Sequence, residues 1–115
     1  MGIEILQLSA ERAVATMPVE GNRQPLGLMH GGAYLVLAET LGSFAANVWA
    51  HPNSHAVGIE ISASHTKSAT EGLVTGVATA ISLGKTLTVH EIVVSNAAGE
   101  RLSTIRITNL IRPNK

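Results

Sequence analysis

The sequence predicts an α+β domain in which an antiparallel sheet packs against one long helix. Residues 31–49 are rich in Ala and Leu and carry a single charge, a composition that favours a buried helix. Four segments with the period-2 alternation of strands follow this helix, and turn residues such as Gly and Asn separate them. Strands joined in succession by short turns pair antiparallel, so helix and sheet are expected to form two layers.

Each element has its own signal in the sequence. Residues 3–8 alternate, but their apolar phase slips by one residue, which is typical of a strand with a bulge. Residues 12–17 are a second extended segment that ends at Pro18. A loop dense in turn residues leads to the helix, which His51-Pro52-Asn53 terminates. The later strands are expected to form a meander of consecutive neighbours, over residues 57–63, 73–81, 86–95 and 102–111.

The composition excludes several classes of protein. The chain has 115 residues, the size of one domain spanning 1–115, with eight basic and eight acidic side chains. A neutral chain without a basic stripe is not expected to bind nucleic acid. The lack of cysteine excludes a disulfide framework and a thiolate nucleophile. The N-terminus resembles no targeting signal and residues 33–50 include polar side chains, so we expect a cytoplasmic protein that does not contact the membrane.

Glu39 is the only charged side chain between Arg23 and Glu60. It lies in the middle of the apolar helix, where a carboxylate is costly to bury unless it is hydrogen-bonded, paired or protonated. One interpretation is a carboxylate that fills a gap or a subunit interface. The favoured one is a general base or nucleophile. Ser43 follows one turn later on the same face, where its hydroxyl could hold a water or the carboxylate.

The helix is expected to begin at His30-Gly31-Gly32. Free N–H groups at a helix start, made accessible by glycine, can stabilise a developing oxyanion. The alternative is a simple tight turn, with His30 bracing the loop through a backbone hydrogen bond. A lipase-like hydrolase is excluded because the Gly-x-Ser-x-Gly motif is missing. Gly31 and Glu39 are eight residues apart, which is about 12 Å along a helix. If both contact the carbonyl group of one substrate, they are expected to come from different subunits of a homodimer.

The other histidines carry weaker signals. His51 and His55 are four residues apart, but Pro52 interrupts a helix between them, so we expect no metal site. His90 falls in the polar phase of its strand and is predicted to lie on the surface. His65 continues the apolar phase of its strand and is predicted to point toward the core or a cleft, with a structural and a functional role both open.

Several motifs together resemble a known family. They cover residues 20–111, and the chain over this range resembles the hotdog-fold acyl-CoA thioesterases, whose sheet wraps around one long central helix. It is most similar to the phenylacetate-pathway type, which includes 4-hydroxybenzoyl-CoA, 1,4-dihydroxy-2-naphthoyl-CoA and enterobactin-pathway proofreading enzymes. The motifs are Gly27-Leu28-Met29-His30-Gly31-Gly32-Ala33, Leu37-Ala38-Glu39-Thr40, Val57-Gly58-Ile59-Glu60-Ile61, Ser64-His65-Thr66-Lys67 and Glu71-Gly72.

The resemblance implies hydrolysis of an acyl- or aroyl-CoA to free acid and coenzyme A, without metal or bound cofactor. It assigns Glu39 as nucleophile or base, and Gly31 of the opposite subunit as the N–H that polarises the thioester carbonyl. Gln24 corresponds to a contact with the thioester or the leaving thiol. Ser43 corresponds to a residue that orients water, and His65 to a pocket histidine. The resemblance also implies a homodimer, or a dimer of dimers, and coenzyme A contacts at Lys67, Gly84, Lys85, Thr86 and Arg112.

Two other functions remain open on sequence grounds. A hydratase or dehydratase of the same fold would share proton transfer between a histidine and a carboxylate. A non-catalytic module that binds acyl-CoA or an acyl carrier would favour an apolar residue in place of Glu39. The acyl group is open as well, because aromatic, naphthoyl and medium-chain groups all suit a pocket of small apolar residues.

Overall fold

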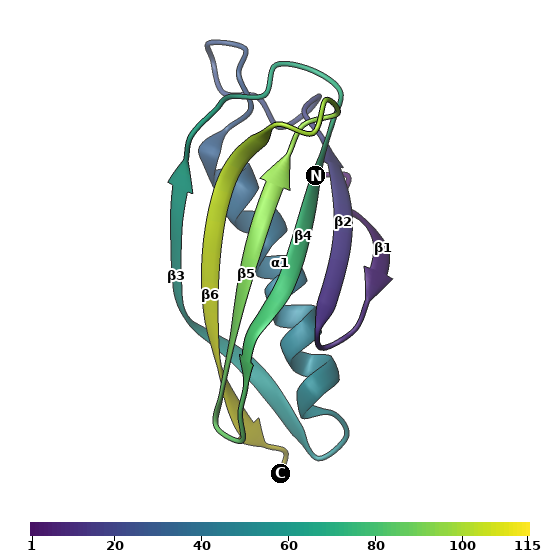
Figure 1. Ribbon diagram of the computed structural model, residues 1–115, viewed down its shortest axis with the longest axis vertical. Helices are drawn as coiled ribbons and strands as arrows, with labels where there is room; N and C mark the ends of the chain where they lie inside the picture. Colours follow the sequence, from purple (N-terminus) through teal and green to yellow (C-terminus); the bar gives the residue numbers. More distant parts are fainter.

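A computed structural model describes all residues, 1–115, as a curved antiparallel sheet with one helix on its concave side (Figure 1). The predicted α+β class and the wrapped helix are confirmed. The sheet order is β1-β2-β4-β5-β6-β3. The elements are β1 (Glu4–Leu8), β2 (Arg12–Pro18), α1 (Gly31–Ala50), β3 (Ser54–His65), β4 (Leu73–Leu83), β5 (Leu87–Ser95) and β6 (Arg101–Pro113).

Both ends of α1 are held by specific hydrogen bonds. At the start, the Gly32 N–H donates to His30 Nδ1 at 3.1 Å, so His30 caps the helix and braces the loop. At the other end, the His51 N–H donates to the Asn47 carbonyl at 3.0 Å. The Asn47 side chain then accepts from the Ala56 N–H at 2.9 Å, which attaches the last turn of the helix to β3.

The predicted meander is correct for β4, β5 and β6 but wrong for β3. β3 pairs with β6 at the sheet edge, and β4 pairs with β2. Alternation shows which face of a strand is buried, but it does not show which strand lies next to it. The connection of seven residues, 66–72, is longer than a hairpin loop and crosses over the end of the sheet instead.

Irregularities in two strands decide where side chains point. The slip predicted in β1 is confirmed as a register shift between Ile5 and Gln7. A second shift lies between Gly58 and Glu60 in β3, where the regular alternation of residues 57–63 predicted none. A bulge moves the side chains that follow it to the other face of the strand. Gly58 and Ile61 therefore lie on the same face of β3, opposite the buried residues Asn109 and Ile107 of β6.

Small residues let α1 approach the sheet closely. A Cβ added to Gly42 would lie 2.4 Å from Ile107 Cγ2, and one added to Gly76 would lie 2.9 Å from Leu41 Cδ1. The core contains little aromatic surface, since Tyr34 is the only buried aromatic side chain. Aliphatic side chains packed against glycine and alanine therefore replace large rings as the filling of this core.

His90 contradicts the sequence prediction. Its side chain is fully buried, and Nε2 lies 2.8 Å from the Ala10 carbonyl oxygen. The buried face of β5 carries Thr88 and His90 next to Ile92 and Val94. When polar residues lie on the inner face of a strand, the sequence pattern of that face resembles the pattern of an exposed face. The prediction from alternation therefore placed His90 on the surface.

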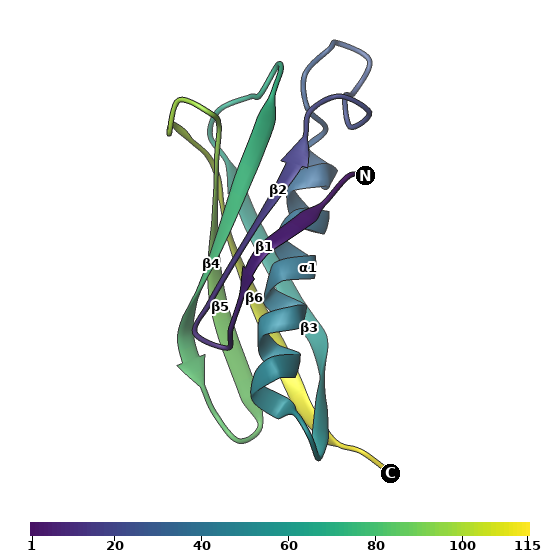
Figure 2. The same cartoon turned by 90° about the vertical axis from the view of Figure 1, so that its right-hand side faces the viewer.

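One side of α1 is left open by the chain itself (Figure 2). Val36, Phe44 and Val48 of the helix are exposed, and so are Val57 and Ile59 of the edge strand β3. An exposed apolar surface of this extent is typical of a protein interface.

No helix is both long enough and apolar enough to span a membrane.

The close contact between α1 and β6 predicts the effect of Gly42→Ala. Alanine favours helix over glycine, yet its methyl group would overlap Ile107, so we expect the free energy of unfolding to fall by about 1–2 kcal/mol. Denaturant unfolding measures this loss. The double variant Gly42→Ala/Ile107→Ala should lose less free energy of unfolding than the two single variants lose in total, because truncating Ile107 removes the overlap. A stabilised Gly42→Ala protein would contradict this packing.

Candidate functional site

The start of α1 forms one half of the candidate site. A cavity of about 320 Å³ opens there between the helix and the end of β3. The Gly31 N–H meets no acceptor within the protein, as expected for the first residue of a helix. The residues that line this cavity are Met29, Gly31, Tyr34, His65, Thr66, Lys67 and Ser68.

His65 lies directly over the helix start. A Cβ added to Gly31 would be 3.2 Å from both Cδ2 and Nε2 of the His65 ring. The rings of Tyr34 and His65 are 5.3 Å apart between centroids. His65 is exposed in the single chain and lines this cavity, so of the two predicted directions, toward the core or toward a cleft, it adopts the second. Glycine at position 31 is what allows the ring and the helix N–H groups to face the same space.

Ser103 orients the His65 ring, and sequence reasoning missed it. Its buried hydroxyl lies 2.8 Å from His65 Nδ1 and donates to the Ser64 carbonyl oxygen at 3.3 Å. These two contacts hold the ring by its Nδ1 side, so Nε2 faces the helix start. The cross-strand pairing of β3 with β6 brings Ser103 here, and no local motif signals it.

Tyr34 completes the wall of this cavity. Its hydroxyl accepts a hydrogen bond from the Ala69 N–H at 3.2 Å. Burial raises the pKa of the Tyr34 hydroxyl above its ordinary value, and the bond from Ala69 opposes this shift. The phenol is therefore neutral at physiological pH, so it adds a polar but uncharged group beside His65.

Glu39 occupies the second half of the candidate site. Its side chain is exposed in the single chain and takes part in neither of the two ion pairs, Arg23–Glu20 and Lys67–Glu100. It borders a hollow of about 360 Å³ together with Thr40, Ser43, Phe44, Gly58 and Asn109. Glu39 and Ser43 thus line one space, as their spacing predicted. Asn109, a fully buried residue beside this hollow, was not predicted.

The structure does not bring Gln24 to either half of the site. Gln24 belongs to the loop before the helix, where its Oε1 accepts from the Leu26 N–H at 2.6 Å. Its backbone N–H donates to the Leu28 carbonyl at 2.7 Å, which closes the loop on itself. The side chain thus stabilises its own loop in the single chain.

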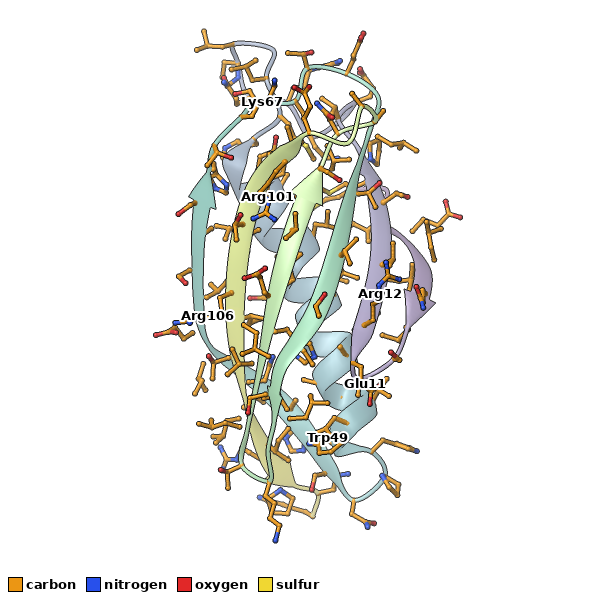
Figure 3. All side chains as sticks on the ribbon, viewed as in Figure 1. Glu11, Arg12, Trp49, Lys67, Arg101 and Arg106 are labelled. Carbon is orange, nitrogen blue, oxygen red and sulfur yellow. The ribbon has the colours of Figure 1, made fainter.

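The residues implied for coenzyme A lie at two opposite ends of the molecule. Lys67 is at the end where α1 begins, whereas Trp49 marks the other end (Figure 3). The Trp49 Nε1–H donates to the Gly84 carbonyl at 2.9 Å, so the turn that carries Lys85 and Thr86 belongs to the Trp49 end. Arg112 lies beside this turn, because Ile111 N donates to the Thr86 carbonyl at 2.8 Å. One chain therefore cannot gather these residues around one ligand.

His51 and His55 do not form part of either half. His55 Nδ1 lies 2.7 Å from Asn114 Oδ1 in the C-terminal segment. No three histidine or glutamate side chains gather closely enough to hold a metal ion. The His55 contact with Asn114 holds the C-terminal segment against the start of β3.

Lys67 is engaged by Glu100, and this pair makes a testable prediction. The pKa of the Glu100 carboxyl is lowered below its ordinary value of 4.5. The main cause is a hydrogen bond from Lys67 Nζ at 2.6 Å, and a hydrogen bond from Asn96 adds to it. In Lys67→Met the pKa of Glu100 should rise toward 4.5, because the charged form loses its main donor. An NMR titration of side-chain carboxyl carbons measures this shift. Lys85→Met is the control, and an unchanged Glu100 pKa in Lys67→Met would contradict the pair.

Comparison with known proteins places the chain in a family. Residues 26–103 match the Thioesterase superfamily. The chain is 41% identical to the proofreading thioesterase EntH of Cronobacter turicensis, covering 96% of this chain and 82% of that protein. It is 42% identical to the 1,4-dihydroxy-2-naphthoyl-CoA hydrolase of Escherichia coli, covering 84% of this chain and 72% of that protein.

The fold agrees with the sequence relationship. A crystal structure of a thioesterase from Haemophilus influenzae superimposes with a TM-score of 0.92 at 34% identity, covering 96% of this chain and 78% of that one. The helix start, the carboxylate on the same helix and the wrapped sheet are thus found in a chain whose relatives cleave thioesters. This chain belongs to the Thioesterase superfamily, with the hotdog fold and the activity of a thioester hydrolase.

Proposed function

We propose that the protein hydrolyses an acyl- or aroyl-CoA thioester to a carboxylic acid and coenzyme A, with Glu39 as nucleophile or general base. The observation that carries this proposal is the position of Glu39. It is a carboxylate without a protein partner, on an otherwise apolar helix, at the edge of a hollow. Such a group is free to act on a substrate, and its reactivity rises when the substrate excludes water.

The site is shared between two copies of the chain. Gly31 and Glu39 are separated by about 12 Å of helix, so they cannot contact one carbonyl group within one chain. The free edge of β3 lies next to the exposed apolar side of α1. Two copies joined edge to edge about a two-fold axis run antiparallel, which brings the helix start of one toward Glu39 of the other. The interface also covers Val36, Phe44 and Ile59.

The two halves then supply complementary chemistry. As a base, Glu39 takes a proton from water, and the oxygen of that water bonds to the thioester carbon. The carbonyl oxygen gains charge, which the Gly31 N–H and the helix dipole stabilise. When the carbon–sulfur bond breaks, the thiolate leaves and the proton on Glu39 returns to it. As a nucleophile, a Glu39 carboxylate oxygen bonds to the thioester carbon, the carbon–sulfur bond breaks and the thiolate leaves, which gives a mixed anhydride. Water then cleaves the anhydride to the free acid and the Glu39 carboxylate, and its released proton goes to the thiolate.

The same arrangement accounts for the divided coenzyme A residues. In an antiparallel dimer, Lys67 of one copy faces the end of the other copy that carries Gly84, Lys85, Thr86 and Arg112. Cationic side chains from both copies can then contact the phosphates of one ligand. A second pairing of such dimers gives the dimer of dimers. The substrate and the lack of cysteine are both compatible with a cytoplasmic enzyme.

Glu39→Gln tests the catalytic assignment. The amide cannot accept a proton or attack a thioester, so we expect kcat with benzoyl-CoA to fall by at least about 100-fold. Release of thiol, followed by a colorimetric reagent, measures the rate. Glu91→Gln on the outer face of the sheet is the matched control and should retain full activity. Near-normal turnover by a folded Glu39→Gln protein would refute the assignment.

Mixing two inactive variants tests the shared site. Glu39→Gln removes the base, and Gly31→Pro removes the polarising N–H at the first helix position, which tolerates proline. Each variant damages both sites of a homodimer, but a mixed dimer keeps one site with Gly31 and Glu39 intact. Refolding the two variants together should therefore restore activity, whereas refolding either alone should not. Light scattering coupled to size exclusion checks that the mixture is dimeric or larger. A site within one chain predicts no recovery.

A further inference from the structure

Trp49 attaches the turn between β4 and β5 to the end of the helix. It lies in the last turn of α1, and its Nε1–H donates to the Gly84 carbonyl at 2.9 Å (Figure 3). No other side chain forms a hydrogen bond to residues 84–86. Trp49 is 43% exposed, so much of its ring lies outside the core. The hydrogen bond to this turn is therefore its specific contact, and the proposed reaction steps do not use it.

Backbone hydrogen bonds hold the other side of the turn. The Gly84 N–H donates to the Leu87 carbonyl at 2.9 Å, and the Thr86 carbonyl accepts from the Ile111 N–H at 2.8 Å. A Cβ added to Gly84 would lie 2.9 Å from the Leu87 carbonyl oxygen, which leaves no room for a side chain at this position. The turn is thus tight, and the Gly84 carbonyl is the one group in it that a side chain fixes.

The Trp49 hydrogen bond decides which way the peptide between Gly84 and Lys85 faces. In a planar trans peptide the carbonyl and the N–H point in opposite directions. Because the Gly84 carbonyl is directed at the indole, the Lys85 N–H points away from it. The N–H groups of Lys85 and Thr86 donate to no group in the chain. Successive free N–H groups in a turn are typical of a site that binds an anion.

Two cationic side chains accompany these N–H groups. Lys85 is exposed within the turn, and the exposed Arg112 lies beside it because the Ile111 N–H binds the Thr86 carbonyl. Neither cation takes part in an ion pair. An exposed cation by itself binds an anion weakly in water, and it binds better when other donors are already held in place around the same anion. Oriented N–H groups and free cations together match a phosphate group.

We propose that Trp49 is a positioning residue for the nucleotide of coenzyme A, because its indole orients the peptide that presents the Lys85 N–H to a phosphate group. This inference rests on the proposed thioesterase function and on the coenzyme A contacts expected for residues 84–86, and it adds the residue that holds them. Without the indole N–H, the peptide can rotate and has to be ordered when the ligand binds, which weakens binding. The chemistry at Glu39 does not depend on this bond.

Two substrates separate a positioning role from a general loss of stability. Benzoyl-CoA carries the nucleotide phosphates, whereas S-benzoyl-N-acetylcysteamine carries the same thioester without them. Trp49→Phe keeps a ring but removes the N–H, so we expect KM for benzoyl-CoA to rise about five-fold at an unchanged kcat. KM for the short thioester should change by less than about two-fold. If the phenylalanine variant fails to fold, 3-benzothienylalanine at position 49, in which sulfur replaces only the N–H, provides the same comparison.

Asn47→Ala is the matched control for a loosened helix end. Asn47 attaches the same last turn of α1 to Ala56 of β3 and leaves residues 84–86 untouched. Its loss should therefore affect the two thioesters equally. The ratio of their kcat/KM values should stay within about two-fold of the wild-type ratio in Asn47→Ala, whereas it should fall about five-fold in Trp49→Phe.

Binding of coenzyme A itself keeps this inference separate from turnover. Titration calorimetry on the full chain should show a Kd that rises about five-fold in Trp49→Phe. An unchanged Kd, or an equal loss on both thioesters, would overturn the inference and leave the thioesterase proposal standing. A five-fold weaker Kd in Trp49→Phe, with neither thioester hydrolysed by the wild-type protein, would refute the thioesterase proposal alone. Absence of both binding and hydrolysis would refute both.

Discussion

The close contact between the helix and the sheet is the constraint on which this structure depends. Gly42 lies against Ile107, and Gly76 lies against Leu41, at distances that leave no room for another methyl group. A helix whose middle is packed this closely has little freedom to shift against the sheet. Its third turn is held beside the hollow that Glu39 borders, and its first turn lies next to His65. The same packing that stabilises the fold also positions both halves of the site.

The division of the site follows from the geometry of one helix. A single helix offers N–H groups at its start and a carboxylate two turns later, too far apart for one carbonyl group. The exposed apolar side of α1 and the free edge of β3 allow a second copy to supply the missing half. Glu39 is exposed in the isolated chain. In the proposed dimer it would be desolvated only when the second copy and the substrate are both present, so the proposal couples catalysis to assembly.

Polar residues on the inner face of the sheet explain where sequence reasoning succeeded and where it did not. The long helix, the backbone hydrogen bond of His30, the β1 bulge and a cleft-facing His65 are local properties and were predicted. His90 was misplaced because a buried polar side chain has the same alternation as an exposed one. Ser103 and Asn109 were missed because cross-strand pairing, not spacing along the chain, brings them to the site.

By itself, the sequence determined the α+β class, the helix from residue 31, and the isolation of Glu39 in an apolar segment, because these depend on neighbours within a few residues. Only the tertiary structure decided that β3 lies at the edge beside β6 and that the residues proposed for coenzyme A lie at two ends. It alone placed Ser103 against the His65 ring. Strand order and cross-strand contacts depend on how distant segments share one core, and periodicity carries no information about that choice.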